Sequence, residues 1–279
     1  MKPTIKRSQI AAMNWHYRQY SFDYFLDTIA RIGYTSVAIW AGPPHFHIDA
    51  EGFEDIKVLR RKLSDRRLSC VSMTAAASQQ MYQMGVSGRK HIEDTVKYFT
   101  NGARIAAELG TNLLTANSGN GYFEEPAEDC WNRTVETMSR VADAAAEYGV
   151  TITVEGLRPP ETRTAPRLID IKRFLQDVNR PNCKPMIDTT AMAVNKENMD
   201  DWFEAFPGEI LNMHFIDASP QGHLAWGDGV LPLQDMLCCM NRHGYTGPLG
   251  LEITDERYFL DPAKASAQTL RVLENYVED

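Results

Sequence analysis

The chain has 279 residues, of which 43% are hydrophobic and 24% are charged, an ordinary balance for one globular domain that excludes a disordered or fibrous chain. Its apolar runs fall far short of the roughly 18 residues that a membrane span needs, so no membrane partner is expected. The net charge of −8 argues against nucleic acid as a partner, because nucleic-acid binders usually present a basic surface.

Short apolar runs alternate with longer amphipathic segments along the chain. The apolar runs, several of them rich in β-branched residues, predict buried strands at 9–13, 36–40, 68–73, 112–117, 150–155, 184–188, 211–217 and 249–253. Amphipathic periodicity predicts helices at 21–33, 53–63, 87–110, 126–149, 166–178, 198–206, 233–244 and 262–276. The first helix has Ser21 as its predicted N-cap and Gly33 as its predicted C-terminal stop.

This alternation predicts the fold class: an α/β protein with a single (β/α)8 TIM barrel over residues 1–279, a fold that typically takes about 250 residues. The alternative is an open doubly wound sheet. That fold usually carries a glycine-rich phosphate loop, and no GxGxxG or GxxxxGK[ST] motif occurs here. The Met- and Gln-rich segment 75–88 is long enough for a functional loop, and we expect a lid or a subunit contact there.

The cysteines indicate a reducing compartment. Five of them are scattered along the chain without any CxxC pair, and two lie in or beside apolar runs, where free thiols are common. The basic N-terminal residues are not followed by an apolar segment, so we expect no secretory signal. Together these features predict a cytoplasmic protein.

Each of the last four predicted strands carries an ionisable residue at or near its carboxyl end that could bind a metal: Glu155, Asp188, His214 and Glu252. In a barrel the carboxyl ends of the strands meet at one mouth, so these side chains should converge there. Three carboxylates that close together would repel one another, and a divalent cation would cancel the repulsion. Three oxygen ligands with one imidazole suit Mn²⁺, Co²⁺, Fe²⁺ or Zn²⁺. The sequence therefore predicts a metal site.

The segments Val154-Glu155-Gly156-Leu157, Met186-Ile187-Asp188-Thr189, Met213-His214-Phe215-Ile216-Asp217 and Leu251-Glu252-Ile253-Thr254 carry a family resemblance. Over essentially the whole chain, the sequence resembles the xylose-isomerase-like TIM barrels, the sugar isomerase and 3-epimerase superfamily. Three further segments, 39–45, 226–233 and 251–254, are similar to its ketose 3-epimerase branch, and most of all to the members that act on fructoselysine.

The resemblance implies one divalent metal ion, Mn²⁺ first and otherwise Co²⁺, Zn²⁺, Fe²⁺ or Mg²⁺, bound by the four residues above. It also implies that Glu155 and Glu252 are the two catalytic carboxylates of a 3-epimerase, which works by two-base proton transfer through a metal-bound enediolate. Inversion needs one base on each face of the sugar, because the proton leaves one side and returns on the other. Glu161 matches a residue that hydrogen-bonds to the first of these carboxylates, and His223 falls near a basic substrate contact.

Two positions depart from the simple ketohexose epimerases. Ala191 stands where those enzymes have a histidine, and Pro220 stands where they have an arginine, and both of those residues contact the sugar. Their absence favours a fructoselysine-like or otherwise modified ketose over free fructose, tagatose or psicose as the small-molecule substrate.

Several residues near predicted strand ends are candidates for lining the mouth: Trp40, His45 and His16. Sugars often stack on aromatic faces, which favours Trp40 as a substrate contact. Asp217 is expected either to orient His214 or to cap the loop that follows.

Other functions are compatible with a similar site. An aldose–ketose isomerase and an inosose dehydratase use a comparable metal centre, and a catalytically silent sugar-binding barrel is the alternative outside the enzymes. An endonuclease-IV-like trinuclear centre would use His45 or His47 after the second strand, but it would also need ligands on the third and fourth strands, which end here in Met73-Thr74 and Asn117-Ser118. We also expect a homodimer or homotetramer.

Overall fold

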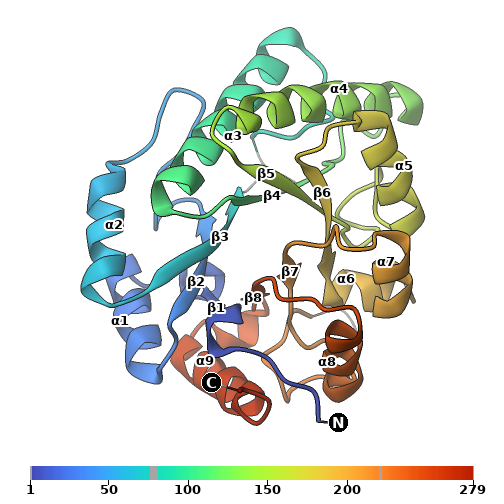
Figure 1. Ribbon diagram of the computed structural model, residues 1–279. Helices are drawn as coiled ribbons and strands as arrows, with labels where there is room; N and C mark the ends of the chain where they lie inside the picture. The colour runs from blue at the N-terminus through green and yellow to red at the C-terminus, as the bar shows by residue number, and fades with distance from the viewer. Residues whose placement is uncertain (1, 76–80, 220–221, 279) are drawn as a thin grey trace.

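The computed structural model describes residues 2–75, 81–219 and 222–278. Eight parallel strands close into a barrel in chain order, with β1 pairing with both β2 and β8 (Figure 1). This confirms the predicted single (β/α)8 barrel. The strands are β1 (Ile10–Met13), β2 (Ser36–Ala41), β3 (Ser69–Ala75), β4 (Leu113–Asn117), β5 (Thr151–Glu155), β6 (Cys183–Asp188), β7 (Met213–His214) and β8 (Leu249–Leu251).

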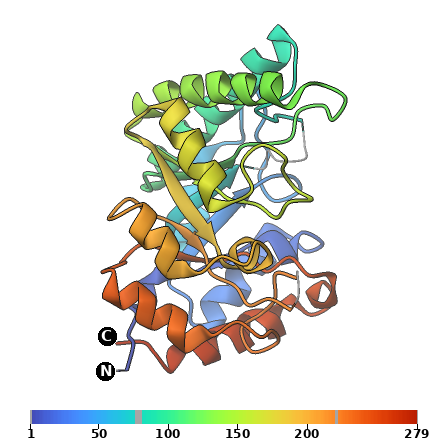
Figure 2. The same cartoon turned by 90° about the vertical axis from the view of Figure 1, so that its right-hand side faces the viewer.

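The α-helices surround the barrel, as the two perpendicular views show (Figures 1 and 2). They are α1 (Phe22–Ile32), α2 (Ile56–Asp65), α3 (Arg89–Leu109), α4 (Ala127–Ala146), α5 (Leu168–Val178), α6 (Thr189–Val194), α7 (Met199–Ala205), α8 (Leu233–Arg242) and α9 (Pro262–Glu274). The sequence pattern did not predict α6, because its six residues are too few to show a helical period.

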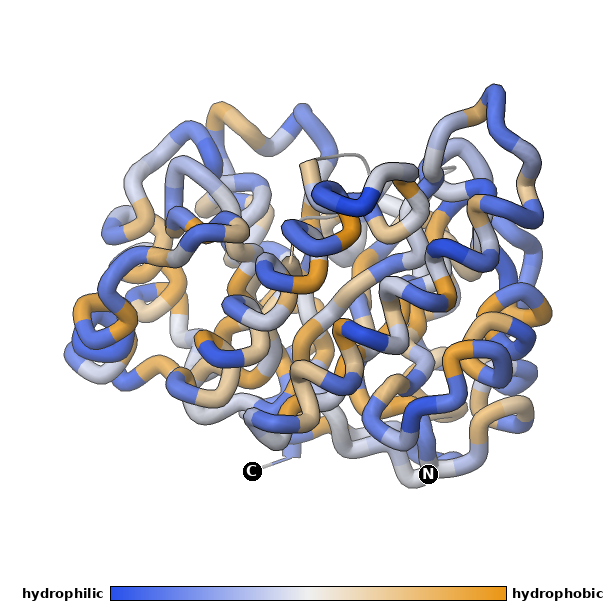
Figure 3. Tube along the Cα trace, turned by 90° about the horizontal axis from the view of Figure 1, so that it is seen from above, coloured by the Kyte–Doolittle hydropathy of each residue, from blue (hydrophilic) through white to orange (hydrophobic). Residues whose placement is uncertain are grey.

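Helix α1 shows why these segments are helical. Ser21 accepts a hydrogen bond from the backbone N–H of Tyr24 at 3.1 Å, and Gly33 ends the helix with a φ of 111°, as predicted. Phe22, Phe25, Leu26 and Ile29 repeat at helical spacing and are buried. The same alternation gives the outer helices of Figure 3 their blue and orange turns.

Strand β5 shows how the barrel places polar groups. Its sequence alternates, so that Ile152 and Val154 pack outward while Thr153 and Glu155 point into the barrel. Thr153 lies 3.2 Å from the Thr115 hydroxyl of β4, and Glu155 follows one layer higher, in register with Asn117. Glu155 therefore stands at the mouth.

The predicted strand at 211–217 is too long, because only Met213 and His214 have strand geometry and form β7. The backbone N–H of Ile216 turns to the hydroxyl of Thr189 at 3.0 Å, and Asp217 pairs antiparallel with Leu224. The chain thus leaves the sheet directly after His214 and forms a loop over the mouth.

The two ends of the described chain lie together at one end of the barrel (Figures 2 and 3). Ile5 donates its N–H to the carbonyl of Tyr276 at 2.9 Å and forms a bridge with Val277. Among the described residues, no helix is long and apolar enough to cross a bilayer.

Candidate metal centre and active site

The four predicted ligands converge at the mouth. Glu155 ends β5, Asp188 ends β6, His214 ends β7, and Glu252 comes directly after β8. One ligand atom from each lies within 4.8 Å of every other. The Nδ1 atom of His214 is central: it is 2.5 Å from Glu155 Oε1, 3.3 Å from Glu252 Oε2 and 3.9 Å from Asp188 Oδ2.

Burying three carboxylates together costs free energy unless a positive charge lies beside them. Glu155, Asp188 and His214 are at most 5% exposed, and the side chain of Glu252 is 15% exposed. Asp188 caps α6 through Oδ1, which accepts the backbone N–H of Ala191 at 2.6 Å, but no hydrogen bond reaches its buried Oδ2. A buried carboxylate oxygen without a hydrogen bond is costly, and this one faces the other ligands and the imidazole of His223, whose Nε2 is 3.3 Å away.

The close spacing of these charged groups also shifts their pKa values. Burial raises the pKa of Glu155 to about 7, although the neighbouring His214 works against the shift. Burial alone would lower the pKa of His214, yet Glu155 and Glu252 raise it well above its ordinary value. Burial would raise the pKa of Asp188, but the two nearby imidazoles lower it overall. A proton on His214 thus compensates part of the negative charge.

These residues fit a divalent cation. Three carboxylates and one imidazole are ligands for Mn²⁺ and similar ions, and Asp188 Oδ2, which accepts no hydrogen bond, would offer an oxygen to the ion. His214 presents Nδ1 to the carboxylates, while its Nε2 is 3.5 Å from the Thr74 hydroxyl at the end of β3. Such a contact on the far nitrogen commonly orients a metal-binding imidazole. The rule that strand ends carry polar residues could have identified Thr74 from the sequence.

His223, predicted as a substrate contact, joins the cluster from the loop after β7. It is 7% exposed, and its Nε2 is 3.3 Å from Asp188 Oδ2 and 3.9 Å from Glu252 Oε2. Its Nδ1 is 3.0 Å from the Thr254 hydroxyl. Burial would lower the pKa of His223, but Asp188 raises it overall. His223 therefore supplies a second positive charge beside the carboxylates.

Glu161, predicted to hydrogen-bond to Glu155, pairs with Arg158 instead. The Arg158 side chain donates to both carboxylate oxygens of Glu161, at 2.8 and 2.5 Å, and the Arg158 backbone N–H adds a bond of 3.2 Å. The two residues lie three apart in one loop, which brings the ion pair together locally. No hydrogen bond between Glu161 and Glu155 is present among the contacts of the described residues.

Trp40 lies on the barrel wall at the level of the cluster. It is in register with Thr74 on β3, whose hydroxyl approaches His214, and it packs in a small group with Met13, Ala38 and Trp15. At 7% exposure it is mainly a wall residue with an edge near the mouth.

His45 and His16 hold loops together. The Nδ1 of His45 is 2.9 Å from the Asn14 amide nitrogen, and its Nε2 is 2.9 Å from the carbonyl of Tyr20. His16 is 2% exposed and lies 3.2 Å from the Ser266 hydroxyl of α9. Burial lowers the pKa of His16 to about 3, so this ring stays neutral. Both predicted substrate contacts thus have structural partners.

Asp217 caps the loop after β7, one of its two predicted roles. Its carboxylate accepts four backbone N–H groups, from Ala218, Gly227, Gly229 and Leu231, at 2.9 to 3.1 Å. This loop carries His223. Of the two departures from the simple epimerases, Ala191 is buried in α6, and Pro220 lies outside the described residues.

The family model described as a xylose isomerase-like TIM barrel matches residues 26–276. The chain belongs to this family, as the resemblance implied. Fructoselysine 3-epimerase from Escherichia coli O157:H7 is 22% identical over 246 residues, which cover 86% of this chain and 88% of that protein. L-ribulose 3-epimerase from Methylomonas sp. (strain DH-1) is 30% identical over 119 residues, 43% of this chain and 41% of that protein. The chain is accordingly an isomerase-type enzyme.

Solved structures confirm the fold. D-allulose 3-epimerase from Methylomonas sp. has a TM-score of 0.80 at 18% identity and covers 98% of this chain and 99% of its own. The 3-keto-D-glucoside 4-epimerase from E. coli has a TM-score of 0.79 at 14% identity, with 96% and 99% covered. The same barrel thus hosts epimerases named for different carbons, so the reacting carbon has to be argued from the site.

Proposed function

We propose that the protein is a metal-dependent ketose 3-epimerase with Mn²⁺ as its metal and a modified, fructoselysine-like ketose as its substrate. The observation that carries the proposal is the cluster of Glu155, Asp188, His214 and Glu252, whose ligand atoms lie within 4.8 Å of one another at the barrel mouth. The two sequence relatives described above, fructoselysine 3-epimerase and L-ribulose 3-epimerase, support C3 as the reacting carbon.

The chain's own residues supply the proton transfers. A divalent cation held by the four ligands would act as a Lewis acid on the ketone oxygen and the neighbouring hydroxyl. Glu155 and Glu252 come from strands three apart around the barrel and reach His214 Nδ1 at 2.5 and 3.3 Å. One carboxylate removes the C3 proton, and the other returns a proton to the opposite face.

The substrate class rests on what replaces two sugar contacts. Ala191 stands in place of the histidine and Pro220 in place of the arginine, and neither side chain carries a hydrogen-bonding group. A site that lacks hydrogen-bond partners for a free ketohexose discriminates against it. The proposal includes a cytoplasmic homodimer or homotetramer. The five free cysteines support the reducing compartment.

The test is epimerisation in D₂O with Mn²⁺, comparing fructosyl-amines with free fructose and psicose. We expect deuterium at C3, and a higher kcat/KM for the fructosyl-amines. Glu155→Gln and Glu252→Gln should each abolish inversion, whereas Glu256→Gln, an exposed glutamate after β8, should leave it intact.

Each other result points to a named alternative. Deuterium at C1 would identify an aldose–ketose isomerase, and loss of water from an inosose would identify a dehydratase. Sugar binding without exchange or turnover would mean a silent sugar-binding barrel. Faster epimerisation of free psicose than of fructosyl-amines would refute the proposed substrate class but would still support the proposed 3-epimerase activity.

A further inference from the structure

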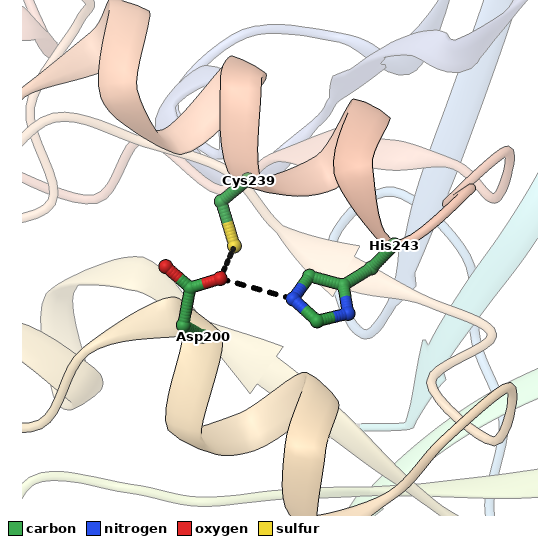
Figure 4. Close-up of side chains that lie close together, drawn as sticks. All are labelled: Asp200, Cys239 and His243. Carbon is green, nitrogen blue, oxygen red and sulfur yellow. Dashed lines mark hydrogen bonds and ion pairs between the residues drawn. The ribbon is translucent and has the colours of Figure 1, made fainter.

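A second group of metal-binding side chains lies outside the barrel, between α7 and α8 (Figure 4). Cys239 and His243 are four residues apart and share one face at the end of α8, and Asp200 approaches them from α7. Figure 4 shows the thiol and the imidazole both directed at the Asp200 carboxylate. We propose that these three residues form a Zn²⁺ site that joins the two helices.

The distances suit a small tetrahedral ion. Cys239 Sγ is 3.3 Å and His243 Nε2 is 2.9 Å from Asp200 Oδ1, and the three ligand atoms lie within 4.8 Å of one another. Zinc bonds of 2.0 to 2.3 Å in a tetrahedron separate neighbouring ligands by roughly 3.3 to 3.7 Å. One thiolate, one imidazole and one carboxylate are ordinary zinc ligands, and solvent supplies the fourth.

Neighbouring side chains hold two of the three ligands, His243 and Asp200, in fixed orientations. His243 stacks on Phe203 of α7 with ring centroids 4.9 Å apart and planes 11° apart, which fixes the imidazole plane. Arg242 contacts both Asp200 oxygens, at 2.7 Å from Oδ1 and 2.6 Å from Oδ2. With Oδ1 on the ion, Arg242 remains bound to Oδ2, and ligating carboxylates commonly have such an outer partner.

Besides the Arg242 N–H, the Cys239 thiol and the His243 ring point at Asp200 Oδ1, and these two groups occupy the place of the ion. Burial raises the pKa of Cys239 to about 12, so the thiol is protonated until a cation displaces its proton. Binding of Zn²⁺ would release the thiol proton to solvent and would leave His243 Nε2 free to bind the ion, with the remaining ring proton on Nδ1. The bound ion then carries one thiolate and one carboxylate, so the charges balance. Proton release makes the affinity rise with pH.

This site differs in chemistry from the centre at the barrel mouth, because only the helix site contains sulfur. Cobalt(II) bound to a thiolate gives a near-ultraviolet charge-transfer band, which a Glu/Asp/His centre cannot give. The readout is therefore independent of catalysis and of the proposed function.

The experiment titrates the chelator-stripped, reduced full-length protein with Co²⁺ and then with Zn²⁺. We expect a thiolate-to-cobalt band with one equivalent bound per chain at this site, and Zn²⁺ should abolish it. Cys239→Ser should remove the band, and Asp200→Asn and His243→Gln should weaken binding at least tenfold. The neighbouring Cys238→Ser is the matched control and should keep the band. Circular dichroism and Mn²⁺ binding at the barrel mouth verify that each variant is folded.

Two results would overturn the inference. Absence of the band at several equivalents of Co²⁺ would show that the three residues are only an ion-paired helix contact. A band that persists in Cys239→Ser would place the thiolate ligand elsewhere.

Discussion

The loop that carries His223 should depend on one buried carboxylate. Asp217 is 3% exposed and accepts four backbone N–H groups, two on each oxygen. In Asp217→Asn, an NH₂ group replaces one of these oxygens and faces two N–H donors. The variant therefore loses two hydrogen bonds to a charged acceptor and leaves two backbone donors without a partner.

Hydrogen bonds to charged groups contribute about 1.5–3 kcal/mol each, so the two losses should cost about 3–6 kcal/mol. This is a large part of the 5–15 kcal/mol that typically separates folded from unfolded protein. Because His223 lies in the same loop, 3.3 Å from Asp188, we also expect kcat/KM to fall at least tenfold.

Urea unfolding followed by circular dichroism measures the free energy of unfolding, provided the slope m stays constant. The matched control is Asp228→Asn, an exposed carboxylate of the same loop that accepts from Tyr258 and Gln268 and should cost less than about 1 kcal/mol. A second test is Gly229→Ala, whose Cβ would lie 2.3 Å from Asp217 Oδ1. A loss below about 1 kcal/mol in Asp217→Asn would refute the reasoning.

Three further predictions concern the mouth and its supports. Asp188→Asn should lower Mn²⁺ affinity in calorimetry because it removes a ligand charge. Glu161→Gln should leave the metal affinity unchanged and slow turnover, because it weakens the ion pair with Arg158 and removes no ligand; equal loss of metal in both variants would contradict these roles. The pKa of His16 falls from 6.5 to about 3, so the unfolded chain binds a proton between these pH values and the folded chain does not. Stability should therefore decline as the pH falls from 6.5 toward 3, by up to about 1.4 kcal/mol per pH unit from this group. Urea midpoints across that range should decline less steeply in His16→Gln than in the exposed control His47→Gln; parallel slopes would exclude the His16 contribution.

The architecture followed from local patterns. The strands are buried along most of their length and each long helix buries one face, and these two patterns appear in the sequence as short apolar runs and as helical periodicity. Ser21 and Gly33 bound α1 as predicted because caps are local interactions. The cluster of candidate metal ligands was predictable for a similar reason: strand ends meet at one mouth in any such barrel, so Glu155 and Asp188 had to approach each other.

The hydrogen-bond and ion-pair partners of individual side chains near the mouth were not predictable in the same way. Two carboxylates in the mouth region, Glu161 and Asp217, took partners other than the metal ligands, namely Arg158 and four backbone amides. Strand β7 ended early because a side-chain hydroxyl, that of Thr189, took the N–H of Ile216. Such competition depends on distances of a few tenths of an ångström, which no sequence period encodes.

By itself, the sequence therefore determined the barrel, the order of its elements and the four side chains at the mouth. Only the tertiary structure decided which further groups join them. It brought His223 to Asp188 and Thr74 to His214, and it placed Asp200 beside Cys239 and His243 across 39 and 43 residues of chain. Periodicity reports how deeply a residue is buried, but hydrogen bonds and metal ligands depend on which surfaces pack together, and that is a property of the whole fold.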